Sequence, residues 1–121
     1  MGKPINLNEV APGRLKPRAA AGIPFRSLPW VRVEGGGASG RTRRHVLSDG
    51  GTARLLDIYP GWNEAGWCEK GHVGYVLSGT MRLDFASQPC ITVRKGDGFE
   101  IPPGCAHKAS TRRGAHLFIV G

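Results

Sequence analysis

The stretch from Gly96 to His107 reads Gly-Asp-Gly-Phe-Glu-Ile-Pro-Pro-Gly-Cys-Ala-His and is the most informative part of the sequence. It predicts a glycine turn, a short strand at Phe99–Ile101, a rigid Pro-Pro-Gly turn and a second strand that begins near His107. Cys105 and His107 are two residues apart, so on a strand they share one face, with Cα atoms roughly 7 Å apart. Side chains at that separation can converge on one ion.

A second group of metal-binding side chain types precedes this stretch, in residues 66–72, which read Gly-Trp-Cys-Glu-Lys-Gly-His. On a straight strand Cys68 and His72 would lie roughly 13 Å apart, too far to share an ion. Gly71 gives the backbone freedom to bend, which would let them approach. A thiolate with imidazoles suits zinc or iron, and three protein ligands leave one coordination position open, as in a catalytic site.

The remainder of the chain predicts short strands joined by turns. It has 19 glycines and 9 prolines among 121 residues, and these are the poorest helix formers. Alternating apolar residues and turn signals predict about eight or nine strands. Their ranges are 25–33, 41–48, 52–59, 74–77, 80–85, 90–93, 99–101, 106–111 and 115–120. We predict a flexible loop for the glycine-rich residues 34–40 and no helix. Such spacing favours an all-β sandwich or barrel.

The chain resembles the cupin superfamily, small β-barrels of jelly-roll form. The second motif of the family, G(X)5PXG(X)2H(X)3N, is met by Gly96, Pro102, Gly104 and His107, with Thr111 in place of the final asparagine. The resemblance extends over roughly residues 52–120 and suggests a small single-domain cupin of the conserved-barrel type.

The first cupin motif, G(X)5HXH(X)3,4E(X)6G, is met less well. Gly61 and Gly79 fit its first and last glycines approximately. The position of the motif's glutamate falls on His72, and its two histidine positions fall on Gly66 and Cys68. The family ligand set of His, His, Glu and His is therefore carried over directly only at His107.

The resemblance implies a cupin jelly-roll barrel, which we assign to residues 25–121. Residues 1–24 contain several prolines and no sustained periodicity, so we predict an extended N-terminal arm there. The resemblance also implies a divalent metal ion, for which we predict Cys68, His72 and His107 as ligands and favour zinc over iron, nickel or manganese. The predicted function is action on a small polar molecule bound in the barrel, by a homodimer.

Three assignments at this site have alternatives. The barrel could be a non-catalytic binding or sensing module without metal, in which Cys68 is a buried apolar residue. We predict Glu69 as a general base, against the simpler interpretation of a solvated loop carboxylate. For Cys105 we favour a packed thiol over a fourth ligand.

The net charge is +8, from 17 basic and 9 acidic side chains, and residues 1–44 account for +7 of it. Arg41 and Arg43 would share one strand face, which could contact phosphates, but no nucleic-acid-binding motif accompanies them. We predict a solvated basic surface, with no nucleic acid as partner. The sequence has no apolar run of membrane-spanning length and an odd number of cysteines, so we expect no membrane partner and a cytoplasmic location.

Overall fold

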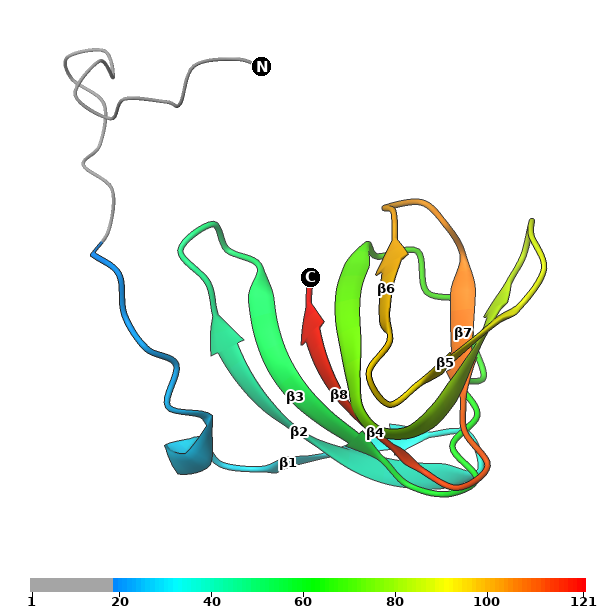
Figure 1. Cartoon of the computed structure of the whole chain (residues 1–121), viewed down its shortest axis with the longest axis horizontal. Coiled ribbons are helices and arrows are strands. Elements are labelled where there is room, and N and C mark those ends of the chain that lie inside the picture. Colours follow the sequence, from blue (N-terminus) through cyan, green and yellow to red (C-terminus); the bar gives the residue numbers. More distant parts are fainter. Residues whose placement is uncertain (1–18) are drawn as a thin grey trace, which may run out of the picture.

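The computed structural model describes residues 19–121, and within them the chain is built of antiparallel strands (Figure 1). A single 3-10 turn, η2 (Phe25–Ser27), precedes the strands, and the described residues contain no α-helix. The strands are β1 (Val31–Gly35), β2 (Ala38–Val46), β3 (Thr52–Ile58), β4 (His72–Phe85), β5 (Ile91–Arg94), β6 (Gly98–Ile101), β7 (His107–Ser110) and β8 (Ala115–Val120). The all-β prediction is confirmed.

Strand β4 joins the two parts of the barrel. The strand order is β1-β2-β3-β8-β4-β5, and both β6 and β7 also pair with β4 (Figure 1). The first half of β4 pairs with β6 and β8, and its second half pairs with β5 and β7. The change of partners falls near Gly79, whose φ of +81° lies in the left-handed region and where an added Cβ would clash with the Gly114 carbonyl oxygen. The predicted strands 74–77 and 80–85 are therefore one bent strand rather than two.

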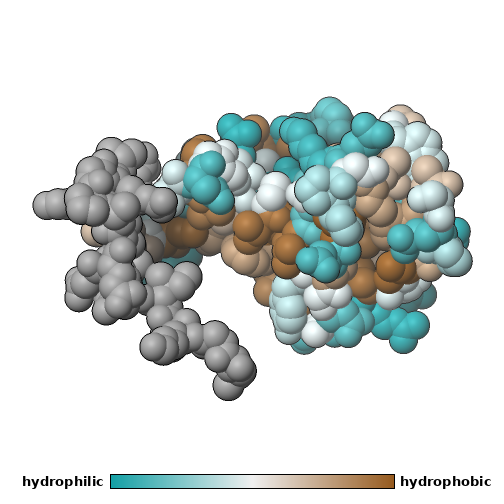
Figure 2. Space-filling view, turned by 90° about the horizontal axis from the view of Figure 1, so that it is seen from above, coloured by the Kyte–Doolittle hydropathy of each residue, from teal (hydrophilic) through white to brown (hydrophobic). Residues whose placement is uncertain are grey.

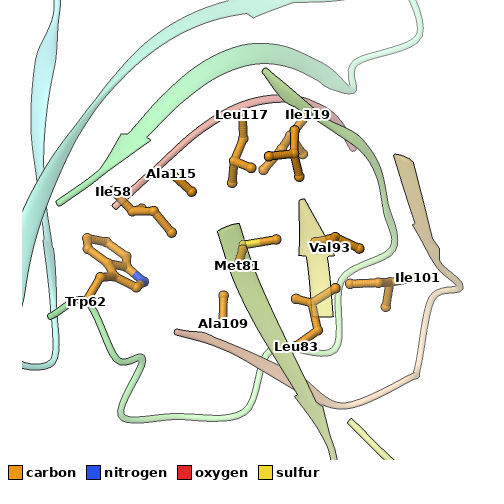
Figure 3. Packing of buried hydrophobic residues seen from close by; sticks show 11 residues of the cluster. Ile58, Trp62, Met81, Leu83, Val93, Ile101, Ala109, Ala115, Leu117 and Ile119 are labelled. Carbon is orange, nitrogen blue, oxygen red and sulfur yellow. The ribbon is translucent and has the colours of Figure 1, made fainter. Parts of the chain in front are cut away.

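The core lies between the two curved parts of the sheet (Figure 3). On β8, Ala115, Leu117 and Ile119 are buried, whereas the residues between them are half-buried. This alternation sends every second side chain inward, as a strand with one covered face requires. The largest fully buried side chains are Met81, Leu83, Leu117 and Val76. These apolar side chains form the closed part of the barrel interior.

The glycine-rich segment is a hairpin, so the prediction of a flexible loop was wrong. Gly35 pairs with Ala38, which leaves a two-residue turn between β1 and β2. Gly35 has no room for a side chain, because the Trp62 ring occupies the position that a Cβ would point to. Gly37 has a φ of +79°, which favours glycine. The glycines allow close packing, and their number does not indicate flexibility.

The predicted strand 25–33 is also shorter than expected. Pro24 and Pro29 flank η2 and lack the backbone N–H that a sheet needs, so regular pairing begins only at Val31. The predicted arm, 1–24, lies mostly outside the described residues, and residues 19–24 carry no strand or helix. No helix in the described part of the chain is both long and apolar enough to cross a membrane.

Candidate metal centre

Three predicted ligand residues meet at one end of the barrel interior. His72 is the first residue of β4, and His107 is the first residue of β7. Cys68 lies before β4 and forms an isolated bridge with His107. The Cys68 N–H donates to the His107 carbonyl and the His107 N–H donates to the Cys68 carbonyl, each over 2.9 Å. Paired residues of this kind direct their side chains to the same face, so the bridge sets Cys68 beside His107.

The side chains of these residues are close enough to share one ion. The Cys68 Sγ lies 3.7 Å from the His72 Nε2, and the ring centroids of His72 and His107 are 5.3 Å apart. One ligand atom from each of the three residues lies within 4.8 Å of the others. Zinc bonds of 2.0–2.3 Å in a tetrahedral site place ligand atoms about 3.3 to 3.8 Å apart. The donor set and its spacing therefore fit a tetrahedral divalent metal after small side-chain adjustments.

His107 is held in an orientation that suits a ligand. Its ring is buried, with only 4% of the residue exposed. Its Nδ1 lies 2.8 Å from the Cys105 carbonyl oxygen, which accepts a hydrogen bond and cannot donate one. Nδ1 therefore donates to this carbonyl, and Nε2 is the ring nitrogen that remains for a metal ion. Cys105 contributes through its backbone, and its thiol does not belong to the three-residue cluster.

His72 is electrostatically biased toward the neutral form. Burial lowers the pKa of its imidazole, and the nearby positive charge of Arg54 lowers that pKa further. Only the neutral imidazole offers a lone pair to a metal ion. The surroundings of His72 thus favour the state that a ligand needs.

A cavity of about 380 Å³ adjoins the cluster. Its floor and walls are the apolar side chains of the core, seen converging in Figure 3. Besides Cys68, His72 and His107, the polar residues lining it are Glu34, Arg54, Glu64 and Lys70. Its size is that of a small-molecule site, and an apolar body with a few polar groups is the usual composition of one.

Glu64 and Arg54 line this cavity, and our sequence analysis missed both. Burial raises the pKa of the Glu64 carboxyl, although the Ala109 backbone and the His107 ring oppose the shift. Arg54 was detectable, because it alternates with Leu56 and Ile58 on the apolar face of a predicted strand. Glu64 gave no such signal, since it lies in an irregular segment between β3 and β4.

Glu69 is not brought to the cavity. Its side chain is exposed and is absent from the cavity lining, while its carbonyl accepts a hydrogen bond from the Gly104 N–H over 2.9 Å. The position of Glu69 therefore supports a structural role in joining two loops. Of the two acidic residues in this segment, Glu64 lines the cavity and Glu69 does not.

Arg41 and Arg43 share the outer face of β2, as predicted. Each guanidinium lies over the Trp30 ring, at 4.0 Å and 4.2 Å from its centroid. Arg41 also pairs with Asp57 over 2.8 Å. Both arginines therefore have partners within the chain, the Trp30 ring for each and Asp57 for Arg41.

Comparisons with known proteins support the fold. No protein-family model matches the sequence, and no curated protein matches it either. Among solved structures, the polyketide cyclase RemF of Streptomyces resistomycificus has a TM-score of 0.68 and 20% identity, over 84% of this chain and 78% of that one. A predicted oxalate decarboxylase of Thermotoga maritima has a TM-score of 0.67 and 12% identity, over 83% and 96%.

A cupin-like protein of Thermotoga maritima is also similar, with a TM-score of 0.60 and 18% identity over 69% of this chain and 68% of that one. Identities this low establish a shared fold and leave the chemistry of this chain to its own residues.

Proposed function

The chain has the cupin fold, a jelly-roll β-barrel, and we propose that the barrel binds one divalent metal ion and acts on a small polar molecule. Cys68, His72 and His107 would hold the metal. The observation that carries the proposal is the approach of their ligand atoms to within 4.8 Å beside a cavity of about 380 Å³. Zinc is favoured over iron, nickel or manganese because the set includes a thiolate.

The chemistry would be divided between the metal and the cavity residues. A divalent metal supplies Lewis acidity, which polarises a bound oxygen or lowers the pKa of a bound water. Hydrogen bonding to the Cys105 carbonyl keeps the His107 ring in one orientation. Glu64, whose pKa is raised by burial, would take up and release a proton at its carboxyl group. The apolar walls exclude bulk water and strengthen these electrostatic interactions.

A non-catalytic binding module without metal is the second candidate. The specific observation in its favour is the contact of 3.7 Å between the Cys68 Sγ and the His72 Nε2, which is also suitable for a thiol-to-imidazole hydrogen bond. In that case the cluster would be a polar end wall of a ligand pocket. Metal content distinguishes the two candidates.

We also retain the homodimer as a proposal. Val73, Tyr75 and Leu77 are exposed on alternate positions of β4, with 55%, 45% and 36% of each residue accessible. Apolar side chains reach the surface in several other places (Figure 2). A row of exposed apolar residues on a sheet face supports contact with a second copy. A cytoplasmic location is likewise proposed, supported by three free thiols.

Elemental analysis of protein purified without added metal tests the leading proposal. We expect about one metal ion per chain in the wild type and a drop of at least tenfold in His107→Ala and Cys68→Ala. Cys105→Ala and His45→Ala are matched controls outside the cluster and should retain the metal. A substoichiometric metal content that His107→Ala leaves unchanged would contradict the proposal and favour the metal-free module.

A further inference from the structure

Arg54 points a cation into the barrel interior. It lies on β3, where its direct cross-strand neighbour on β8 is the buried Ile119. Direct neighbours share a face of the sheet, so the Arg54 side chain is on the inner face, and it lines the cavity. Charged groups seldom occupy such a position unless a partner compensates them.

Arg54 has no such partner among the described residues. Its Nε is buried without a hydrogen-bond acceptor, and the guanidinium belongs to no ion pair within 4.0 Å in this part of the chain. Burial lowers its pKa, while Cys68 and Glu64 are close enough to favour the charged form. A guanidinium remains protonated in proteins, so the positive charge persists inside the cavity.

The neighbours of Arg54 increase the excess of positive charge. Arg44 is directly opposite Arg54 on β2, and like charges in that relation are destabilising. Lys70 also lines the cavity. Of the two acids in the lining, Glu34 already pairs with Arg32 over 2.5 Å. Glu64 is therefore the other acid in this lining, and it lies beside Arg54 while Lys70 is exposed to solvent.

We propose that Arg54, whose Nε lacks an acceptor in this cavity, binds the carboxylate of a small organic acid, with the apolar part of the molecule inside the barrel. The planar fork of a guanidinium matches a carboxylate in a bidentate arrangement. The apolar lining, which includes Leu56, Ile58 and Leu117, can contact the hydrocarbon part of an organic acid. An inorganic anion has no apolar part that would gain from these contacts. This inference names the substrate class of the proposed function and rests on it.

Calorimetric titration with charged and neutral probe pairs tests the proposal. The probes are benzoate against benzamide and hexanoate against hexanamide, at pH 7, with inorganic phosphate as a further anion. Each is titrated into the wild type, Arg54→Gln, Arg54→Lys and the control Arg94→Gln, whose arginine lies on β5 outside the cavity lining. Metal content is measured separately on each sample, and the series is repeated on His107→Ala.

We expect at least one carboxylate to bind the wild type tenfold or more tightly than its amide. Arg54→Gln should abolish that preference, Arg54→Lys should keep part of it, and Arg94→Gln should leave it unchanged. Arg54→Gln should also retain its metal and unfold at a temperature no lower than the wild type, because it removes a half-buried cation whose Nε has no hydrogen-bond acceptor. A merely structural arginine would instead lower the unfolding temperature without changing the preference.

Three results would overturn the inference. They are equal binding of acids and amides by the wild type, a preference that survives in Arg54→Gln, and tighter binding of phosphate than of either carboxylate. If Arg54→Gln fails to fold, the inference is still tested by the preference of the wild type for carboxylates over amides and by the weakening of that preference in Arg54→Lys. A preference for carboxylates that persists in metal-free His107→Ala would support the anion site even where the metal proposal fails.

Discussion

The two ends of the barrel interior differ in how well their groups are satisfied. At the closed end, Met81, Leu83 and Leu117 are at most 2% exposed and belong to the cluster of buried apolar residues, with one side toward the cavity. At the polar end, near Cys68 and His72, half-buried ionisable groups have shifted pKa values, and the Arg54 Nε has no hydrogen-bond acceptor among residues 19–121. Packing alone explains the closed end. At the polar end, the desolvation of charged groups is unfavourable for folding, and a bound metal and ligand would offset that cost. For this reason we propose that the functional site lies there.

The largest effect on stability is expected at the closed end. Leu117→Ala removes a side chain that is 1% exposed and leaves a cavity among its neighbours. The free energy of unfolding should fall by about 2 to 5 kcal/mol. Denaturant titration measures this, and the metal content per folded chain should not change. If Leu117→Ala lost metal while remaining folded, the two ends would not be separable as we describe.

A smaller change in the free energy of unfolding, and of opposite sign, is expected for a substitution at the polar end. Glu64→Gln keeps the shape of the side chain and removes a carboxylate that burial disfavours. Because the folded-state pKa of Glu64 lies above its ordinary value of 4.5, the carboxyl destabilises the fold as pH rises through that range. Unfolding free energy at pH 7 should therefore rise by at most about 1 kcal/mol, since water still screens a partly exposed group.

The pH dependence gives the control for that variant. At about pH 3, well below the ordinary pKa of 4.5, the carboxyl is almost fully protonated in both states, so the stability difference between Glu64→Gln and wild type should largely disappear. Glu69→Gln, with an exposed carboxylate outside the cavity, is the matched comparison and should show no pH-dependent gain. A stability loss in Glu64→Gln at pH 7 would indicate that its carboxylate is satisfied in the fold.

The smallest effects are expected for the thiol next to the site. The Cys105 side chain is half-buried, and Cys105→Ser replaces its sulfur with oxygen. The hydrogen bond that orients His107 goes to the backbone carbonyl of residue 105, which the substitution keeps. We expect a stability change below about 1 kcal/mol and unchanged metal content. Loss of metal in Cys105→Ser would make this thiol a fourth ligand.

Local signals in the sequence predicted much of the fold. Between Gly96 and His107, the turns and strands follow from glycine and proline at fixed positions, and β6 and the start of β7 lie where the motif indicates. The glycines of the first hairpin were misinterpreted because their function is non-local: Gly35 makes room for Trp62. A count of turn residues cannot distinguish a mobile loop from a tightly packed one.

The candidate site was only partly predictable for the same reason. Gly71 suggested that the chain could bend and bring Cys68 toward His72, but the bridge that sets Cys68 beside His107 joins distant segments. Glu64 and Glu69 lie in the same irregular segment, where no periodicity says which carboxylate points inward. Arg54 is different, since its alternation with Leu56 and Ile58 was readable from the sequence.

Cobalt substitution tests the central claim most directly. Chelator-treated protein is titrated with Co²⁺, and the absorption of thiolate-bound, four-coordinate cobalt is followed in the near ultraviolet and visible range. We predict saturation at one ion per chain in the wild type and in Cys105→Ser, with loss of the thiolate band in Cys68→Ser and of tight binding in His107→Ala. A wild-type spectrum identical to that of Cys68→Ser would contradict a metal centre built on Cys68, His72 and His107.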